Sequence, residues 1–317
     1  MRRNLLLVIS ATILSLLFAE VVVRFIPPDV SVLRNLVVRS DSPIGYRLKP
    51  NVSIEFGGLF ESLPKTVRWA TNPQGIRSPD VIAEEASKWR VATFGDSETF
   101  GWSVEQSETY QARLEALATG VEVINFGVPG YNTTNILLAM REQLPRFRPD
   151  VTVYLFNKND FDVPLAVTDT EFTSQLFGRI RFFWQVSAAR EQRQRERKSA
   201  QRTQVAVDDL RQMTELAETS QVPLLVVFMR RKELERMKPS ILGDATMLQA
   251  LDSGVLTLVD GEPALGGTQR LDDHLGPRAH ELLARQLCDL PRICVSGASS
   301  PAVAAAGDAD SRTLLRD

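Results

Sequence analysis

The sequence predicts an α/β protein built around a parallel sheet that helices cover on both faces. From residue 88 onward, apolar strand-like segments alternate with amphipathic helical segments, a pattern typical of parallel sheets buried on both sides. Polar or glycine-rich clusters follow the strands, as ligand-binding loops do in such sheets. The composition, 44% hydrophobic and 24% charged over 317 residues, suits one large globular domain with attachments.

The alternation predicts each element in turn. Strands are expected at residues 90–94, 121–126, 149–156, 223–229 and 253–260. Helices are expected at residues 107–118, 133–147, 207–220 and 277–287. Upstream, two short β-like segments, at residues 51–56 and 65–72, are divided by glycines and a proline. They favour a small β-rich lead-in or hairpin over a separate domain.

These segments predict four regions along the chain. Residues 1–28 form an N-terminal membrane anchor or signal peptide, and residues 29–87 form the β-rich lead-in. Residues 88–295 form the main α/β domain, which contains an inserted helical and basic segment at about 165–205. The final stretch, 296–317, is rich in Ala, Gly, Ser and Asp without a periodic apolar face, so a disordered tail is expected.

The first residues predict a membrane-spanning helix. Two arginines precede a largely apolar run at residues 5–19, which residues 21–23 extend past Glu20. About 19 such residues fit a single span, whereas the shorter run alone fits the core of a signal peptide. Leu17 stands where a cleavage site would have a small residue, which favours the uncleaved anchor. The rest of a single-pass membrane protein would then lie on the periplasmic or extracytoplasmic side.

Composition limits the chemistry that is available. A net charge of −2 provides no general attraction to nucleic acid, so no nucleic-acid partner is expected. The chain has only two histidines, His274 and His280, and a mechanism that needs an imidazole must use one of them. Cys288 and Cys294 lie six positions apart, and both a disulfide and buried thiols are open. No cofactor or metal is expected.

Four polar or glycine clusters are expected at one edge of the sheet. Gly-Asp-Ser (95–97) follows the first strand of the alternation, Gly-Val-Pro-Gly (127–130) the second, and Asn-Lys-Asn-Asp (157–160) the third. Asp-Asp-His (272–274) precedes the last helix. Because ligands bind beyond the carboxyl ends of parallel strands, these clusters should converge on one site. This convergence is the strongest functional indication in the sequence.

The clusters contain the pair that serine-based hydrolysis requires. Ser97 can act as the nucleophile, and an imidazole must then take its proton. His274 precedes Gly276 and Pro277, which suit a helix cap and a first helical position. His274 is therefore expected on a loop at the mouth of the last helix, facing the site. His280, on the apolar stripe of that helix, is interpreted as structural.

The remaining groups of such a site are also present. Asp272 is the simplest acid to orient the imidazole. Gly130 lacks a Cβ, so its backbone N–H can approach a substrate closely, and the side-chain amide of Asn159 can donate a second hydrogen bond to an oxyanion. Each cluster also has a structural interpretation, as a helix cap, a glycine turn, an Asx turn or charge matching at a helix start. Their shared position after strands favours catalysis.

The segments FGDSETFG, NFGVPGYNT, NKND and DDHLGPRAH resemble the four conserved blocks of the SGNH/GDSL hydrolase family, in the family's order, over about residues 88–290. The resemblance implies a three-layer α/β/α sandwich with a flavodoxin-like sheet. It also implies Ser97 as nucleophile, His274 as base, and an oxyanion hole formed by the N–H groups of Ser97 and Gly130 with Asn159. Upstream, IGYRLKPN and TNPQGIRSPD resemble lead-in motifs of membrane-anchored bacterial members.

Two positions depart from the family pattern. Where the family has a glycine two residues before the third-block asparagine, this chain has Asn157, which would either crowd the oxyanion site or add a donor. The family's acid stands three residues before the histidine, and that position is Leu271. Asp272 must then reach His274 from a shifted register, or a backbone carbonyl orients the imidazole instead.

Residues 179–202 carry three consecutive aromatic side chains, at 182–184, followed by several arginines. A cap over the active site, a contact with anionic lipid headgroups and a solvated charged helix are all open interpretations.

The sequence predicts an exported, membrane-tethered serine esterase that forms an acyl-enzyme. Its expected partner is an acyl-ester substrate, chiefly an O-acetyl ester on an envelope or extracellular glycan, including an acylated polysaccharide. The alternatives are an O-acyltransferase that uses the same residues, a lysophospholipase, and a catalytically degenerate carbohydrate-binding module.

Overall fold

The computed structural model describes residues 2–25, 35–57, 63, 65–162 and 199–294. Its centre is a five-stranded parallel sheet with the strand order β6-β5-β7-β8-β9. The strands are β5 (Trp89–Gly95), β6 (Val121–Gly127), β7 (Val151–Phe156), β8 (Leu224–Phe228) and β9 (Leu256–Asp260). The prediction of an α/β fold around a parallel sheet is confirmed.

The sheet is buried because its strands are apolar on both faces. Every residue of β7 and β8 is buried, as expected for strands covered on both sides. With β5 counted as the first strand, the order is 2-1-3-4-5, which is the flavodoxin-like arrangement. In this arrangement the chain leaves β5 in one direction and β6 in the other, so the carboxyl end of β5 lies at the switch point where ligands bind.

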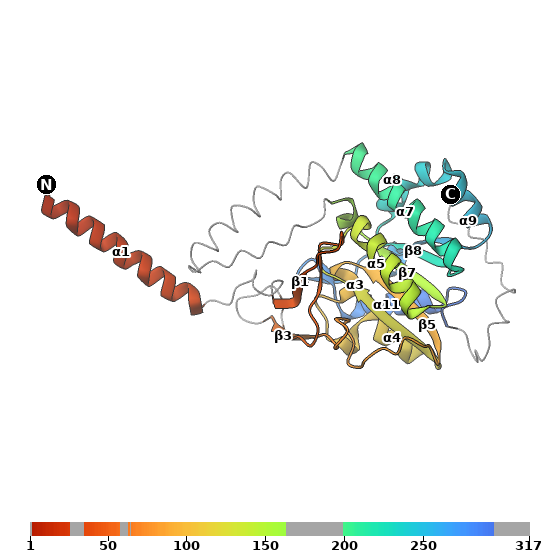
Figure 1. Cartoon of the computed structure of the whole chain (residues 1–317), viewed down its shortest axis with the longest axis horizontal. Helices are drawn as coiled ribbons and strands as arrows, with labels where there is room; N and C mark the ends of the chain where they lie inside the picture. Colours follow the sequence, from red (N-terminus) through yellow and green to blue (C-terminus); the bar gives the residue numbers. More distant parts are fainter. Residues whose placement is uncertain (1, 26–34, 58–62, 64, 163–198, 295–317) are drawn as a thin grey trace.

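Helices form the two outer layers (Figure 1). One face of the sheet packs against α4 (Tyr110–Leu117) and α11 (Pro277–Cys288). The other face packs against a larger group of helices, which consists of α5 (Thr133–Phe147), α7 (Ala200–Ser220), α8 (Arg231–Leu242) and α9 (Ala245–Asp252). Three short elements follow the ends of strands: α3 (Ser97–Phe100), η2 (Lys158–Phe161) and α10 (Glu262–Leu265). A fourth, η1 (Gln106–Glu108), directly precedes α4.

The helices differ from the sequence prediction in three places. The helix expected at 107–118 is divided, because the Thr109 side chain accepts the N–H of Ala112 and starts α4 after the separate turn η1. Helix α7 begins at Ala200 rather than at residue 207, with Ser199 as its cap. Helices α8 and α9 were not predicted. Each buries only one apolar stripe in otherwise polar or short sequence, which weakens the periodic signal.

The lead-in folds as two antiparallel ribbons, β1 (Val37–Arg39) with β2 (Tyr46–Leu48), and β3 (Ser53–Phe56) with β4 (Val67–Ala70). Their buried side chains join the same core as α5 and α7. The Tyr46 hydroxyl donates to the carbonyl of Pro129 at 3.0 Å, and the Tyr131 hydroxyl donates to the carbonyl of Tyr46 at 2.5 Å. The lead-in therefore contacts the loop that follows β6.

Helix α1 spans Arg2–Phe25 and lies apart from the α/β body in Figure 1. Within the part of the chain that the structure describes, no helix has the length and apolarity to cross a membrane. The prediction of a single-pass membrane protein with its main domain on the periplasmic or extracytoplasmic side is therefore wrong.

At the end of α11, Cys288 and Cys294 form a disulfide, which resolves the alternatives that their spacing left open. Most of the inserted segment expected at about 165–205, including the aromatic residues 182–184, lies outside the described residues. The tail expected at 296–317 also lies outside them.

Candidate active site

In the turn after β5, one residue caps the following helix and the next residue, Ser97, presents its hydroxyl to the candidate site. Asp96 is the N-cap of α3, and its side chain accepts the N–H of Glu98 at 2.9 Å. Ser97 is the first residue of the helix, and its hydroxyl contacts His274. The capping interpretation of Gly-Asp-Ser therefore applies to the aspartate, and the serine hydroxyl is used elsewhere.

Glycines at the ends of β5 and β6 allow α3 to lie directly on the sheet. Gly95 and Gly127 are register partners. A Cβ on Gly127 would lie 2.2 Å from the backbone nitrogen of Phe100, and a Cβ on Gly95 would lie 2.1 Å from the Thr99 hydroxyl. Because real Cβ atoms do not approach so closely, both positions need glycine for the helix that carries Ser97 to pack in this place.

His274 lies in a short hairpin rather than on the loop that the sequence predicted. Strands β10 (Arg270–Leu271) and β11 (His274–Leu275) pair antiparallel, with Leu271 opposite His274. The two turn residues, Asp272 and Asp273, have φ of +51° and +58°. Positive φ at both central positions is what a type I′ hairpin turn requires, and aspartate tolerates it better than most residues. Pro277 starts α11 after the Gly276 cap, as expected.

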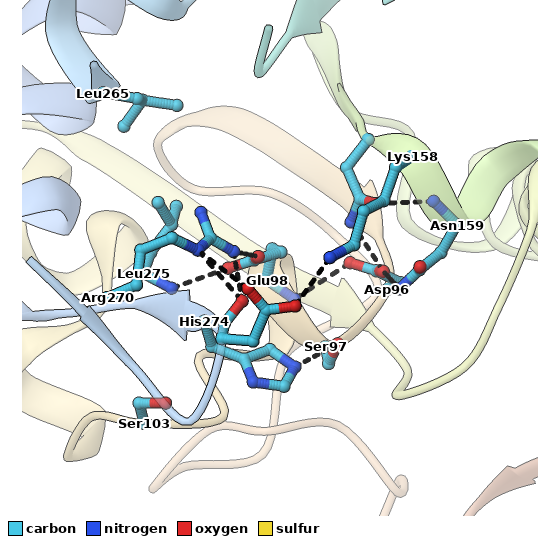
Figure 2. Close-up of polar contacts among 12 residues, drawn as sticks. Asp96, Ser97, Glu98, Ser103, Lys158, Asn159, Leu265, Arg270, His274 and Leu275 are labelled. Atoms are coloured by element: carbon cyan, nitrogen blue, oxygen red, sulfur yellow. Dashed lines mark hydrogen bonds and ion pairs between the residues drawn. The ribbon is translucent and has the colours of Figure 1, made fainter. Parts of the chain in front are cut away.

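The imidazole of His274 contacts one oxygen on each ring nitrogen. Its Nε2 lies 2.8 Å from the Ser97 hydroxyl oxygen (Figure 2), and its Nδ1 lies 2.5 Å from the main-chain carbonyl oxygen of Asp272. A carbonyl can only accept, so Nδ1 must carry the hydrogen in the neutral ring. Nε2 is then the acceptor for the serine hydrogen, which is the tautomer that a general base needs.

The Asp272 carboxylate does not supply the contact to the imidazole. It accepts the indole N–H of Trp102 at 2.9 Å. Of the two arrangements that the sequence left open, the structure has the backbone carbonyl orienting His274. The physical reason is the tight turn, which directs the Asp272 carbonyl back toward the histidine two residues later.

Trp102 is a site residue that the sequence reasoning missed. Its ring stacks on the His274 imidazole, with 5.6 Å between centroids and 28° between planes. Behind it, the lead-in residues Trp69 and Phe56 contact Trp102 at centroid distances of 4.2 Å and 5.2 Å. The lead-in thus supports the histidine through one indole ring. No spacing rule links these positions, because the contact is made only in the folded chain.

The loop after β7 is bound to Asp96. Asn157 and Asn159 both donate their side-chain amides to the Asp96 carboxylate, at 2.7 Å and 3.1 Å, and Figure 2 shows the Asn159 contact. The Asn157 side-chain oxygen accepts the N–H of Asn159 at 2.7 Å and caps η2. Asn157 therefore orients Asp96 and Asn159, which is a different role from the crowding or extra donor that the sequence suggested.

Gly130 lies on the loop after β6, where its φ is +83°. This loop is attached to the end of β5, because the N–H of Val128 donates to the carbonyl of Gly95 at 3.1 Å. The lead-in contact to Pro129 holds it from the other side. The four sequence clusters are thus connected to β5 or to its following turn by hydrogen bonds.

Burial controls the charges beside Ser97. Burial and the neighbouring Glu98 raise the pKa of Asp96 to about 6, and its hydrogen bonds from the Glu98 N–H and Asn157 oppose that rise. Burial lowers the pKa of His274 below its usual 6.5, while the negative charge of Asp96 opposes that decrease. At neutral pH His274 is therefore mainly uncharged and able to accept a proton.

His280 is separate from this chemistry. Its Nδ1 accepts the N–H of Tyr110 at 3.1 Å, its ring stacks on the Tyr110 ring, and it is 1% exposed. Within the described ranges, no group of three or more His, Cys, Asp or Glu side chains could hold a metal ion.

A family model and several solved structures are similar to this chain. The model of the GDSL-like lipase/acylhydrolase family matches residues 93–280. Similar solved structures include TesA, with 15% identity, 62% of this chain and 95% of the other covered, and a TM-score of 0.42. A GDSL-like lipase from Bacteroides thetaiotaomicron has 14% identity, coverages of 64% and 88%, and a TM-score of 0.40.

A variant of the acetyl-xylooligosaccharide esterase Axe2 from Geobacillus has 14% identity, coverages of 65% and 95%, and a TM-score of 0.41. Similarity at this level carries no argument about a substrate. No curated protein matches the chain.

The family model covers well over half of the chain and includes every cluster described above, from the end of β5 to α11. The resemblance found in the four sequence blocks is thereby confirmed. The protein belongs to the GDSL-like lipase/acylhydrolase family, the SGNH/GDSL hydrolases that act on ester bonds.

Proposed function

We propose that the chain hydrolyses O-acyl esters through an acyl-enzyme on Ser97, with His274 as the general base. The observation that carries this proposal is the 2.8 Å contact between the Ser97 hydroxyl oxygen and the His274 Nε2. This distance is within hydrogen-bond reach for proton transfer, and the tautomer required by the Asp272 carbonyl leaves Nε2 ready to accept.

In the proposed reaction the Ser97 oxygen attacks the ester carbonyl while its proton passes to Nε2 of His274. The imidazolium that forms keeps its Nδ1–H on the Asp272 carbonyl and is stabilised by the nearby charge of Asp96. His274 then returns the proton to the leaving alcohol. In the second half, His274 takes a proton from the water that attacks the acyl-enzyme. It then returns this proton to the Ser97 oxygen as the bond between that oxygen and the acyl group breaks and the acid is released.

The developing oxyanion would be held by the N–H groups of Ser97 and Gly130 and by the side chain of Asn159. Ser97 supplies an N–H at the start of α3, where the first backbone donors of a helix have no partner within it. An amide nitrogen carries two hydrogens, and the contact of Asn159 with Asp96 fixes the plane of that amide. Rigid donors of this kind stabilise transition-state charge without reorganisation.

The substrate that we propose is a short acyl ester, chiefly an acetyl ester, of a glycan. Charged side chains surround the serine–histidine pair in Figure 2. The Lys158 ammonium and the Asp273 carboxylate form a 2.6 Å ion pair between η2 and the hairpin turn, and the Asp273 side chain is 71% exposed. A hydroxyl-rich alcohol fits such polar surroundings better than a lipid does.

The test is hydrolysis of p-nitrophenyl acetate and labelling by a fluorophosphonate probe in wild-type protein and in Ser97→Ala. Loss of both signals in the variant is expected. Ser253→Ala is a matched control, because that hydroxyl only caps the end of α9 through the Ala250 carbonyl. Hydrolysis that continues unchanged in Ser97→Ala would refute the mechanism. With an acetylated glycan, free acetate supports hydrolysis, whereas an acetylated acceptor would contradict it in favour of acyl transfer.

A further inference from the structure

The hairpin that carries His274 cannot hold its own position. Strands β10 and β11 have two residues each and form a separate two-stranded sheet outside the central one. Even longer isolated hairpins are at best marginally stable in water. The distance between Ser97 and His274 therefore depends on contacts between this hairpin and the rest of the protein, among them those to the turn after β5.

Glu98 makes such a contact from the position next to Ser97. Its side chain is buried, and its carboxylate binds both strands of the hairpin. One oxygen, Oε2, accepts the N–H of Leu275 at 2.8 Å, and the other, Oε1, forms an ion pair with Arg270 (Figure 2). Arg270 and Leu275 are cross-strand partners, one register step from the pair that contains His274.

Arg270 extends this link to the turn. Its Nε donates to the main-chain carbonyl of Asp273 at 3.0 Å, and its Nη2 donates to that carbonyl and to Glu98. A planar guanidinium can make these contacts together, whereas an ammonium presents no such fork. The Glu98 carboxylate, the guanidinium and the turn carbonyl thus form one connected unit.

Other contacts attach different parts of the hairpin. The Ser103 hydroxyl donates to the Leu271 carbonyl at 2.7 Å, and Trp102 binds the Asp272 side chain. These contacts hold β10 and the turn. The hydrogen bond from the N–H of Leu275 to Glu98 attaches β11, at the residue that follows His274.

We propose that Glu98 is the positioning residue that sets the distance between Ser97 and His274, acting through Leu275 and Arg270. The inference rests on the proposed roles of Ser97 and His274. Glu98 and Ser97 share the first turn of α3, and Leu275 and His274 share β11. One side chain therefore fixes the two reacting groups relative to each other.

The first measurement is steady-state hydrolysis of p-nitrophenyl acetate by Glu98→Gln and Arg270→Lys. Glutamine retains an acceptor for Leu275 but loses the charge that binds Arg270, and lysine retains the charge but loses the fork. Since a misplacement of about 1 Å can cost roughly 100-fold in rate, we expect kcat to fall about 10- to 100-fold. KM should stay within about twofold, because Glu98 contacts the hairpin rather than the substrate.

The second measurement is NMR of protein with ¹⁵N-labelled histidine, which the chain suits because it has two histidines. His274 reports on the site, and His280, buried against Tyr110, reports on the fold. We expect the His274 ring signals to shift in Glu98→Gln and Arg270→Lys while those of His280 stay in place. The double variant Glu98→Gln/Arg270→Lys should lower kcat by less than the product of the two single effects, because both act through one contact.

Glu142→Gln is the matched control, since it makes the same change in the Arg47–Glu142 ion pair away from the hairpin. Its kcat and His274 signals should match wild type. Unchanged kcat and unchanged His274 signals in Glu98→Gln and Arg270→Lys would overturn the proposal. Equal changes of the His274 and His280 signals would also overturn it, because they indicate a general loss of structure. If wild-type protein shows no Ser97-dependent hydrolysis, the proposed function fails, and the His274 signals still test the role of Glu98.

Discussion

The His274 imidazole is oriented by the main-chain carbonyl of Asp272, with 2.5 Å between Nδ1 and the oxygen. A carbonyl fixes the ring and its tautomer as a carboxylate would, but it brings no full negative charge. The charged partner that most strongly favours the imidazolium is Asp96, the residue that immediately precedes Ser97 in the chain. Orientation and charge stabilisation of the base therefore come from two different residues.

The first prediction concerns the Asp272 side chain. In Asp272→Asn we expect kcat to stay within about threefold of wild type, because the orienting carbonyl is retained and the amide oxygen can accept the Trp102 N–H. Asparagine also tolerates the positive φ at this position. If the carboxylate were the triad acid, the same change would cost roughly 10⁴-fold in kcat. Steady-state kinetics separates the two outcomes.

Trp102→Phe removes the donor of the hydrogen bond between Trp102 and Asp272. Phenylalanine retains a ring to stack on His274 and loses the indole donor that holds the Asp272 carboxylate. We expect a moderate fall in kcat, about 5- to 20-fold, since removing one positioning contact disturbs geometry without removing a reacting group. In Trp102→Phe/Asp272→Asn the second change should add little. An unchanged kcat in Trp102→Phe would show that the indole contact to Asp272 does not position His274.

The activity should depend on a group that titrates below pH 6.5. Burial lowers the pKa of His274, so its neutral, proton-accepting form persists at lower pH than for an exposed histidine. We expect kcat/KM to rise with pH along an acid limb whose midpoint is below 6.5 and then to stay level through pH 7–8. Because Asp96 has a pKa of about 6 and interacts with His274, the limb belongs to the pair. A midpoint above 7 would contradict this assignment.

The side-chain amide of Asn159, proposed as a hydrogen-bond donor to the oxyanion, can be tested with Asn159→Ala. Removing one oxyanion donor typically costs 10²- to 10³-fold in kcat, and we expect a loss of about 100-fold with little change in KM. Gln212→Ala removes a side-chain amide that contacts Arg141 on the surface and should retain full activity. A KM effect in Asn159→Ala without a kcat effect would place Asn159 in ground-state binding instead.

Much of the fold and of the site could be predicted because local pattern encodes it. The strand at β7 and the helix at α5 were expected within one or two residues of their observed ends, since continuous apolar runs and a capped amphipathic segment are local signals. Ser97, His274 and Asn159 were singled out as candidates because each follows a strand or precedes a helix. The switch point of the sheet then brings them together.

The supporting residues could not be predicted in this way. Glu98 and Trp102 closely follow Ser97 in sequence, but their partners, Arg270 and Asp272, are about 170 positions later. Contacts between residues so far apart produce no periodic pattern in the sequence. The orienting group at Asp272 is a carbonyl, which every residue has, so side-chain identity suggested a carboxylate instead. The membrane span expected in the N-terminal segment was a wrong prediction, since no helix among the described residues has the length and apolarity to cross a membrane.

A close backbone approach predicts a strong effect of Gly127→Ala. The new Cβ would lie 2.2 Å from the Phe100 nitrogen and 2.6 Å from the Thr99 carbonyl carbon, and both atoms are backbone of the helix that carries Ser97. We expect the free energy of unfolding to fall by about 3 kcal/mol, as for overpacking in a core. Gly120→Ala is the comparison variant. A Cβ at Gly120 would meet nothing within 4 Å, so this change carries only the strain of a side chain at positive φ. Urea denaturation should therefore show a smaller loss there, about 1 kcal/mol.

His280 predicts how stability depends on pH. Burial lowers its pKa from 6.5 to about 3, and its Nδ1 must stay unprotonated to accept the Tyr110 N–H. Between pH 6.5 and 3 the unfolded chain therefore binds a proton that the folded chain does not, and stability decreases as pH falls, by up to about 1.4 kcal/mol per pH unit. His274 acts in the same direction, whereas Asp96, whose pKa is raised from 3.8 to about 6, acts in the opposite one. In His280→Gln, urea denaturation between pH 7 and pH 5 should show a lower stability at pH 7 and a slope reduced by about 0.7 proton on average. An unchanged slope would mean that His280 has the same pKa in the folded and the unfolded chain.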